Sequence, residues 1–426
     1  MLPGSTLQLL ITMVDYNHIF SKRAQGMKAS EIRELLKLTQ RPGIISFAGG
    51  LPNPDAFPKE TTLKIVNELL NEIPEKVLQY GSTEGVPELR KALAENMAKR
   101  GMKVELNQIM ITHGSQQALD LLSRVLLDPG DTIVVGSPTY LGATGAFRAF
   151  QARMETVPVG EDGMDMDALD KKLNELDKEG KKPKFVYTVP TFQNPSGVTI
   201  PGENRKRLLE ICSKYDVLIV EDSPYSYLRY EGEPQPHLLS LDTEDRVLRL
   251  QTFSKILAPG FRIAWAVGPA QLIDKMVIAK QAGDLCSNPF GQYVAWKYIA
   301  SGALDEHLEY IKELYNEKRL TMLEAMEQHF PPEAKWNKPM GGMFVWVKLP
   351  EYINTREMFE KALQQNVAYV VGDAFYVENE GYNTMRLNFS HSSEEEIKEG
   401  IKRLGEVIKQ EIAEKKGKIT ETIITP

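Results

Sequence analysis

The 426-residue sequence contains only two cysteines, Cys212 and Cys286. Two cysteines cannot form the disulfide framework of a small secreted protein, and these two lack the paired spacing of a structural zinc site. We therefore expect no metal site. The scarcity of cysteine is typical of a protein from the reducing cytoplasm, so we predict a cytoplasmic location.

Basic residues are not in excess either, because 51 Lys and Arg stand against 58 Asp and Glu, for a net charge of −7. A dedicated nucleic-acid-binding protein carries a basic surface, so this composition predicts no nucleic-acid partner. No apolar run reaches the roughly 20 residues that span a bilayer. The apolar stretch 7–14 follows no Lys or Arg and precedes no small-residue cleavage site, unlike a secretory signal. We expect no membrane association.

From about residue 104 the chain alternates short β-rich runs with longer helical patterns. This alternation predicts an α/β fold with a mostly parallel sheet flanked by helices. After about residue 305 a long charged helical pattern leads to further strand-like runs, as in a smaller α+β domain. We predict an N-terminal arm and helix (14–60) that packs on the small domain or on a partner, a large domain (61–305) and a small C-terminal domain (306–426).

Polar residues follow the predicted strands, and in open α/β sheets ligands bind at the carboxyl ends of the strands. Ser115 and Gln116 follow the run QIMITHG and begin a helix, whose free N–H groups favour a phosphate. Ser is also a common N-cap without any ligand, which is the alternative. The sequence has neither GxxxxGK nor GxGxxG, so such a phosphate need not belong to a nucleotide.

Asp222 ends the apolar run VLIVED, and a buried carboxylate must find a partner. A protonated heterocyclic nitrogen would serve, and so would a structural pairing with an internal Arg. Tyr225, in the following turn, either meets the same ligand or lies half-buried at the surface.

Lys255 follows RVLRLQTFS, where partial desolvation favours the neutral amine that forms a Schiff base, and a solvated loop lysine is the alternative. Arg262, seven residues later, suits a phosphate.

Tyr140 and Asn194 follow two other predicted strands and add a flat aromatic ring and an amide. A phosphate cradle, a ring, an amide, a carboxylate, a phenol and an amine are together the parts that bind pyridoxal 5′-phosphate.

The chain resembles the fold-type I, pyridoxal-phosphate-dependent aminotransferases of class I/II, and among them the kynurenine/2-aminoadipate branch with its LysN-like and multi-substrate archaeal enzymes. The resemblance covers almost all of residues 30–408. The stretches that carry it are ISFAGGLPNPDAFP, LQYGSTEGVPELR, ITHGSQQALDL, YTVPTFQNPSGVT, VLIVEDSPYSYL, TFSKILAPGFRIAW, GGMFVWV and MRLNFS.

This resemblance implies that Lys255 forms the internal aldimine and carries the proton of the reaction. It implies that Asp222 holds the pyridinium N–H, that Asn194 and Tyr225 bond the 3′-oxygen, and that Tyr140 stacks on the ring. The residues that would share the phosphate are Ser115, Gln116, Thr252, Ser254 and Arg262.

For the substrate, the resemblance implies that Arg386 clamps the α-carboxylate beside Asn194 and Gly50. Arg33 matches an arginine that touches the substrate side chain, and a solvated helix arginine is the alternative. Tyr80 matches a tyrosine that reaches the phosphate in the partner subunit, which implies a homodimer with shared sites. His113 departs from the family pattern, because many relatives have Ser there.

The expected reaction is a ping-pong transamination between an amino donor and 2-oxoglutarate. The expected donors are 2-aminoadipate, kynurenine, and aromatic or branched-chain amino acids. One alternative is β-elimination or decarboxylation with the same cofactor on the same fold. A transcription regulator built on an aminotransferase-like domain is a further alternative. It requires a helix-turn-helix module, which the acidic composition and the short segment before SEIREL do not favour.

Overall fold

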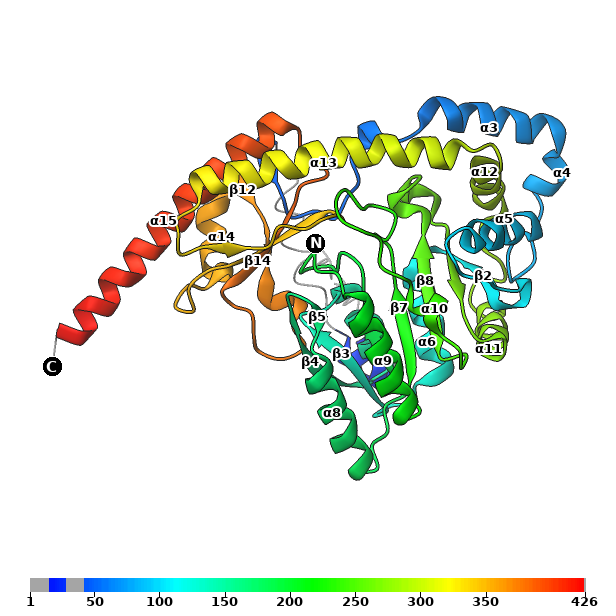
Figure 1. The fold of residues 1–426 in the computed structure, drawn as a ribbon, viewed down its shortest axis with the longest axis horizontal. Helices are drawn as coiled ribbons and strands as arrows, with labels where there is room; N and C mark the ends of the chain where they lie inside the picture. The colour runs from blue at the N-terminus through cyan, green and yellow to red at the C-terminus, as the bar shows by residue number, and fades with distance from the viewer. Residues whose placement is uncertain (1–14, 28–41, 425–426) are drawn as a thin grey trace, which may run out of the picture.

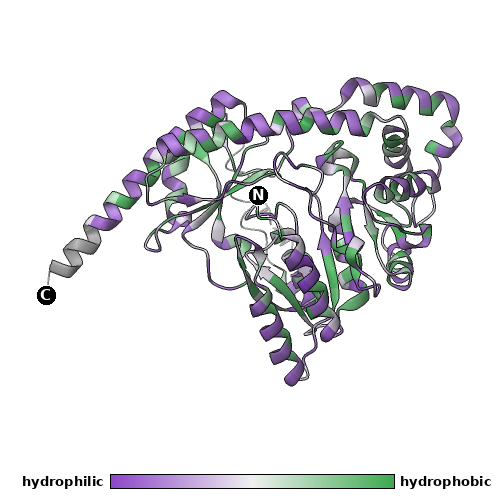
Figure 2. Cartoon of the chain, viewed as in Figure 1, coloured by the Kyte–Doolittle hydropathy of each residue, from purple (hydrophilic) through white to green (hydrophobic). Residues whose placement is uncertain are grey.

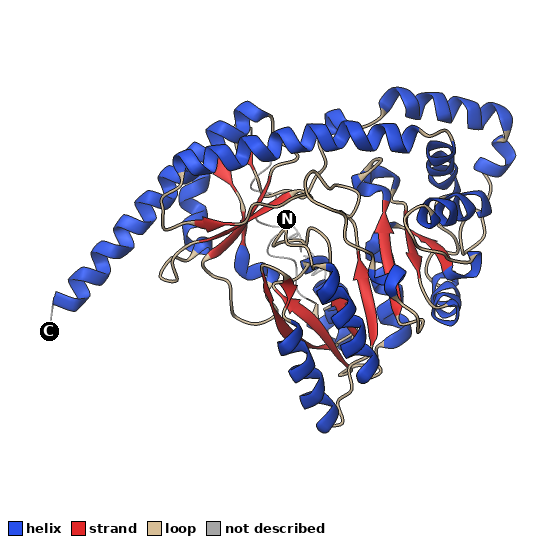
Figure 3. Cartoon of the chain, in the orientation of Figure 1, coloured by secondary structure: helices blue, strands red, loops and turns tan. Residues whose placement is uncertain are grey.

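The structure is a computed structural model that describes residues 15–27 and 42–424, with side chains to residue 417. Arg33, the helix predicted around it and residues 1–12 lie outside the described residues. The chain folds around one large and one smaller sheet, with helices on both faces of the large one (Figures 1 and 3). The predicted α/β fold with a large, mostly parallel sheet is confirmed.

The large sheet has eight strands in the order β2-β9-β8-β7-β6-β3-β4-β5. Its central strands β8, β7, β6, β3 and β4 run parallel, whereas β9 is antiparallel to β8 and β2, and β5 is antiparallel to β4. The strands are β2 (Ile109–Thr112), β3 (Thr132–Ser137), β4 (Arg153–Gly160), β5 (Gly163–Met164), β6 (Phe185–Thr188), β7 (Leu218–Asp222), β8 (Val247–Thr252) and β9 (Ala264–Val267).

Sequence reasoning missed β4 and β5. Seven of the eight β4 residues are exposed or only partly buried, and the sequence of β4, RMETVPVG, carries two charges and a proline, so it lacks the apolar run of a central strand. The other strands of this sheet were predicted, because each is buried on both faces.

Helices cover both faces of the large sheet because alternate strand residues point to opposite sides. On β3, Ile133 and Val135 pack with α6, α7 and α11, whereas Val134 packs with α8 and α9. In Figure 2 the covering helices are apolar on one side and hydrophilic on the other. These helices are α6 (Gly114–Leu126), α7 (Leu141–Ala149), α8 (Met166–Lys178), α9 (Gly202–Lys214), α10 (Leu238–Leu241) and α11 (Ala270–Gln281).

The smaller sheet is antiparallel, in the order β10-β11-β14-β13. The 27-residue helix α13 runs from the large sheet's helices to this sheet, along the upper edge of Figure 1. A third, two-stranded sheet pairs β1 in parallel with β12. The elements are β1 (Ile45–Ser46), β10 (Lys335–Trp336), β11 (Phe344–Lys348), β12 (Val367–Ala368), β13 (Val370–Val371), β14 (Thr384–Asn388), α13 (Ala303–His329), α14 (Thr355–Gln364) and α15 (Glu394–Ile424).

The remaining helices are α1 (Lys22–Gly26), α3 (Lys59–Glu72), α4 (Pro74–Val77), α5 (Pro87–Ala98), α12 (Pro289–Ala300), and the 3-10 helices η1 (Tyr16–His18), η2 (Pro54–Ala56), η3 (Leu106–Gln108), η4 (Phe253–Lys255), η5 (Pro259–Phe261) and η6 (Gly372–Phe375). One hydrophobic core joins α3, α5 and α12 to the smaller sheet. The predicted division of the chain into an arm (14–60), a large domain (61–305) and a small domain (306–426) stays a prediction. Its second boundary falls in the first turn of α13. No helix in the described part of the chain is long and apolar enough to cross a membrane.

Candidate active site

One cavity of about 350 Å³ opens at the carboxyl ends of the parallel strands β3, β6, β7 and β8, and β14 of the smaller sheet closes one side. It brings together nearly all of the predicted site residues. Those that line it are Gly50, Ser115, Gln116, Tyr140, Asn194, Asp222, Tyr225, Thr252, Ser254, Lys255, Arg262 and Arg386.

Lys255 lies in η4, directly after β8, and its side chain is half-buried. Its Nζ donates a hydrogen bond to the Gly50 carbonyl at 2.7 Å. Burial lowers the pKa of Lys255 to about 8, and the nearby cations Arg386 and Arg262 act in the same direction. Lys255 therefore holds a large neutral fraction near pH 8, unlike a solvated loop lysine.

Asp222 ends β7 and is 2% exposed. Its Oδ2 accepts a hydrogen bond from the Tyr187 hydroxyl at 2.8 Å, and its Oδ1 has no hydrogen-bond partner among the described residues. Burial raises the pKa of Asp222 to about 6, against the opposing effects of Tyr187 and Arg249. In the described part of the chain Asp222 forms no ion pair with an arginine, and Arg249 on the neighbouring strand pairs with Glu221.

At the other end of the cavity, hydroxyl groups gather beside a guanidinium. Thr252 Oγ1 donates to Ser254 Oγ at 2.9 Å, and Arg262 Nη1 donates to the same oxygen at 3.3 Å. Ser115 is not the N-cap of α6, since His113 holds that position, and Ser115 Oγ is a buried oxygen without a hydrogen-bond partner in the described chain. This end has the donors that an anion requires.

A glycine makes room for that guanidinium. Gly114 has φ +73°, and a Cβ added there would lie 2.1 Å from Arg262 Nη2. Only a residue without a side chain allows the start of α6 and Arg262 to approach so closely.

Arg386 lies on β14 and is 5% exposed. Its Nη1 donates to Asn194 Oδ1 at 2.8 Å and its Nη2 to the Ala48 carbonyl at 2.9 Å. Its guanidinium carbon lies 4.2 Å from the Phe344 ring centroid and 5.1 Å from that of Phe375. The two rings fix the plane of the guanidinium. A carboxylate that lies in the same plane can then accept hydrogen bonds from the N–H groups along the guanidinium edge. Sequence reasoning missed both rings.

Tyr140 and Tyr225 add two phenol rings to the cavity wall. Tyr140 is the N-cap of α7, and a Cβ added at Gly142 would lie 2.4 Å from its ring, so the ring lies against bare backbone. Gln116 Nε2 donates to the Gly142 carbonyl at 2.8 Å and ties α6 to α7. Tyr225 hydrogen-bonds Asn194, and burial raises its pKa.

Residues 53–404 match the family model for aminotransferase class I and II. The chain belongs to this family. The aromatic-amino-acid aminotransferase 1 of Thermococcus litoralis is 53% identical over 400 residues, which cover 94% of this chain and 96% of that protein. The chain is therefore an enzyme that transfers amino groups.

Two solved structures of aminotransferases are similar over almost the whole chain. The Pyrococcus horikoshii kynurenine aminotransferase, in complex with PMP, KYN as substrates and KYA as products, gives a TM-score of 0.91 at 52% identity and covers 93% of this chain and 98% of its own. The second is LysN, the α-aminoadipate aminotransferase from Thermus thermophilus, complexed with N-(5'-phosphopyridoxyl)-L-leucine. It gives a TM-score of 0.87 at 39% identity, and the match covers 94% of this chain and 100% of LysN. The cofactor of this aminotransferase is pyridoxal phosphate.

The cavity fits this cofactor. A pyridinium N–H needs a buried acceptor, and Asp222 Oδ1 is one without a partner in the described chain. A phosphate needs hydroxyl donors and a cation, and the unpartnered Ser115 Oγ lies in the same cavity as Arg262. An aldehyde needs a neutral amine, for which Lys255 has the lowered pKa.

Among the described residues, one predicted site residue of this aminotransferase lies outside its cavity. Tyr80 is 80% exposed and does not line the cavity, and Arg33 lies outside the described residues. His113 lies at the edge, with its main-chain N–H bonded to Gln117 Oε1 at 2.8 Å and its Nδ1 3.6 Å from Asp284 Oδ2. Burial lowers the pKa of His113, which Asp284 opposes and the cations Lys280 and Arg262 reinforce.

Proposed function

We propose that this aminotransferase moves the amino group of 2-aminoadipate, kynurenine, or an aromatic or branched-chain amino acid to 2-oxoglutarate in a ping-pong reaction. The observation that carries the proposal is the content of one cavity, which holds an amine with a lowered pKa, a buried carboxylate oxygen without a partner in the described chain and an arginine clamped between aromatic rings. These groups bind the cofactor, the substrate and the proton that moves between them.

Arg386 binds and orients the α-carboxylate shared by all amino and oxo acid substrates. A guanidinium meets a carboxylate with two parallel hydrogen bonds, which sets the direction of the substrate as well as its position. Phe344 and Phe375 hold that plane, and Asn194 holds one edge of it. The substrate Cα is thereby directed towards Lys255 in the same cavity.

Lys255 binds the cofactor through its amine, is released by the incoming donor, and then takes the proton from the donor Cα. Its pKa of about 8 makes the neutral amine available for this transfer near neutral pH. Pyridoxal phosphate, when bound, supplies the electron sink that stabilises the carbanion at Cα. Asp222 keeps the ring nitrogen protonated, and Ser115, Arg262, Thr252 and Ser254 hold the phosphate.

The proposed donor range has support from the cavity wall and from the relatives. Apolar Ala48, Leu141, Val189 and Pro224 line the cavity beside the polar groups, so it accepts aromatic and aliphatic side chains. The relatives are named for aromatic amino acids, kynurenine and α-aminoadipate, and one of them carries a leucine adduct.

We also propose a homodimer in which Tyr80 completes the phosphate site of the partner subunit. The Tyr80 ring is 80% exposed and contributes nothing to its own cavity, which is what such a role requires.

The donor range is tested by a panel of amino donors assayed with 2-oxoglutarate, for the wild type and for Lys255→Ala. We expect the named donors to yield glutamate and the matching 2-oxo acid with the wild type only. Release of ammonia instead of glutamate, or equal turnover by Lys255→Ala, would contradict the proposal.

A further inference from the structure

A second cavity, also of about 350 Å³, lies between the segment that follows β7 and helix α13, and no lining residue is shared with the active site. Its polar and charged side chains come from four parts of the chain: Arg100 after α5, Thr191 after β6, Lys312 on α13, and the segment 226–237. The residues of that segment that line it include Ser226, Tyr227, Arg229, Tyr230, Glu231 and His237.

Three cations, Arg100, Arg229 and Lys312, and one carboxylate, that of Glu231, line this cavity, and the Glu233 carboxylate opposes the lowering of the Arg229 pKa by burial. Arg100 and Arg229 have no carboxylate within ion-pair distance in the described part of the chain, and Arg229 donates only a long hydrogen bond to the Glu231 carbonyl at 3.3 Å. The Glu231 carboxylate is already paired with Arg319. Lys312 pairs with Glu309 on its own helix at 2.7 Å, an exposed pair of small energy.

Both arginines are held in place by aromatic rings. The Arg100 guanidinium carbon lies 4.1 Å from the Tyr227 ring centroid, and that of Arg229 lies 4.7 Å from the centroid of Phe192. Arg386 in the active site is held over Phe344 in the same way, at 4.2 Å. The Arg100 guanidinium also hydrogen-bonds the Tyr227 side chain. A guanidinium has five N–H donors, so stacking and this bond hold the group in place and leave further N–H groups for an oxyanion at little cost in side-chain entropy.

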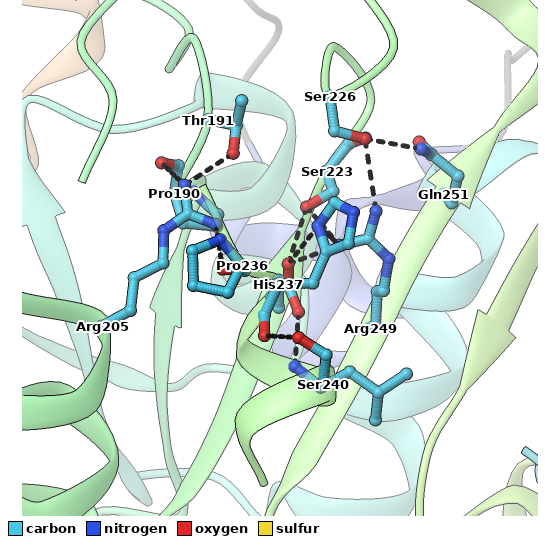
Figure 4. Close-up of polar contacts among 12 residues, drawn as sticks. Pro190, Thr191, Arg205, Ser223, Ser226, Pro236, His237, Ser240, Arg249 and Gln251 are labelled. Atoms are coloured by element: carbon cyan, nitrogen blue, oxygen red, sulfur yellow. Dashed lines mark hydrogen bonds and ion pairs between the residues drawn. The ribbon is translucent and has the colours of Figure 1, made fainter. Parts of the chain in front are cut away.

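Behind the cavity lining, a buried arginine bonds one of the lining residues (Figure 4). Arg205 is 0% exposed, and its hydrogen bonds go to carbonyl oxygens and to Thr191 Oγ1 at 2.8 Å, which lines the cavity. Because Thr191 accepts from Arg205, its own proton is available to a ligand. Ser226 and His237 belong to the neighbouring network around Arg249.

We propose that this cavity binds a phosphate dianion, either free or as the terminal group of a small organic phosphate, through Arg100, Arg229 and Lys312. Guanidinium groups that stack on rings and form no ion pair in the described part of the chain, with the Thr191 hydroxyl in the same cavity, are the donors that a phosphate requires. The bound anion connects α13 to the segment after β7, and the main chain of that segment forms an isolated β-bridge from Arg229 to Gly341, in the connection between β10 and β11.

Calorimetric titration of the full-length holoenzyme with inorganic phosphate, and separately with glycerol 3-phosphate, tests this site. Saturating pyridoxal phosphate keeps the cofactor's own phosphate site occupied, and a constant ionic strength removes general screening effects. We expect saturable binding of one anion per chain at millimolar concentration. Tighter binding of glycerol 3-phosphate identifies an organic phosphate as the ligand, and equal binding identifies free phosphate.

Arg100→Gln and Lys312→Gln should each weaken phosphate binding about tenfold, since each removes a charge-assisted hydrogen bond, and should leave the transamination rate unchanged. Arg229→Gln should also weaken phosphate binding about tenfold. Because this change removes the packing of Arg229 on Phe192 and can disturb folding, the test relies on the Arg100 and Lys312 variants if the Arg229 variant does not fold. Arg124→Gln, an exposed arginine on α6, is the matched control and should bind phosphate like the wild type.

Absence of saturable binding, or binding that is unchanged in both Arg100→Gln and Lys312→Gln, would overturn the proposal. Loss of phosphate binding in Arg386→Gln would also overturn it, because the anion would then lie in the active site.

Discussion

At the scale of single residues, the site depends on neighbours that prepare each reactive group. Tyr187 holds one oxygen of Asp222, and the other oxygen has no hydrogen-bond partner among the residues that the structure describes. Burial and two cations give Lys255 a pKa of about 8. Each reactive group therefore has a second residue that determines its state.

Tyr187→Phe should weaken the binding of pyridoxal phosphate about tenfold or more. The change removes one hydrogen bond to a charged group, which contributes about 1.5–3 kcal/mol, and retains the ring that packs on Phe147 and Phe185. Fluorescence titration of the apoenzyme with the cofactor measures the effect, with Tyr215→Phe at the end of α9 as the control. Equal affinity in the two variants would show that Tyr187 does not support Asp222.

The sequence predicted residues that the structure places in one cavity, because Lys255, Asp222, Asn194 and Arg386 stand in motifs with specific neighbours. It did not identify Tyr187, Phe344 or Phe375. Tyr187 meets Asp222 because β6 and β7 pair side by side, and Phe375 meets Arg386 through loop geometry. Such contacts depend on the register of strands and the path of loops, which no local pattern reveals.

At the scale of elements, the strands that end at the cavity are joined by a buried ion pair. Glu221 on β7 is 0% exposed and pairs with Arg249 on β8. Burial by itself raises the pKa of Glu221, but Arg249, His237 and Arg205 more than offset it and hold that pKa well below its usual range. The carboxylate therefore stabilises the fold at neutral pH, and this stabilisation is lost only as the pH falls through that lowered pKa.

Arg249→Met should destabilise the protein by about 3–5 kcal/mol at pH 7, because it leaves Glu221 buried without its partner. In the variant the pKa of Glu221 rises, so the carboxyl group takes up a proton on acidification. The difference in melting temperature from the wild type should therefore shrink between pH 7 and pH 5. Arg153→Met removes a more exposed pair and should cost less than about 1 kcal/mol. A difference that grows on acidification would contradict this account.

Gly114→Ala should reduce cofactor affinity, because the new Cβ would collide with Arg262 Nη2 and the backbone has a positive φ. Gly145→Ala is the control, since no atom lies within 4 Å of a Cβ added there and helix α7 favours alanine. Equilibrium dialysis of pyridoxal phosphate against both variants measures the difference. Wild-type affinity in Gly114→Ala would show that Arg262 does not need this space.

At the scale of the whole molecule, the cavity is complete only where the two sheets meet, since Arg386 comes from the smaller sheet and Lys255 from the end of a strand in the larger one.

The proposed homodimer adds Tyr80 of the second subunit to this cavity. Light scattering should give twice the mass of the chain, and Tyr80→Phe should weaken cofactor binding without changing that mass. A monomeric enzyme with full cofactor affinity would contradict the dimer.

The most direct test of the central claim is the half-reaction of the holoenzyme with one donor, followed by absorbance without any 2-oxo acid. We predict that 2-aminoadipate or an aromatic amino acid converts the bound cofactor to its amine form with release of one 2-oxo acid per site, and that 2-oxoglutarate then restores the original spectrum. Lys255→Ala should give neither change. A wild-type spectrum that does not respond to any donor, or a Lys255→Ala enzyme that completes the cycle at the wild-type rate, would contradict the assignment of this cavity and this lysine to amino transfer.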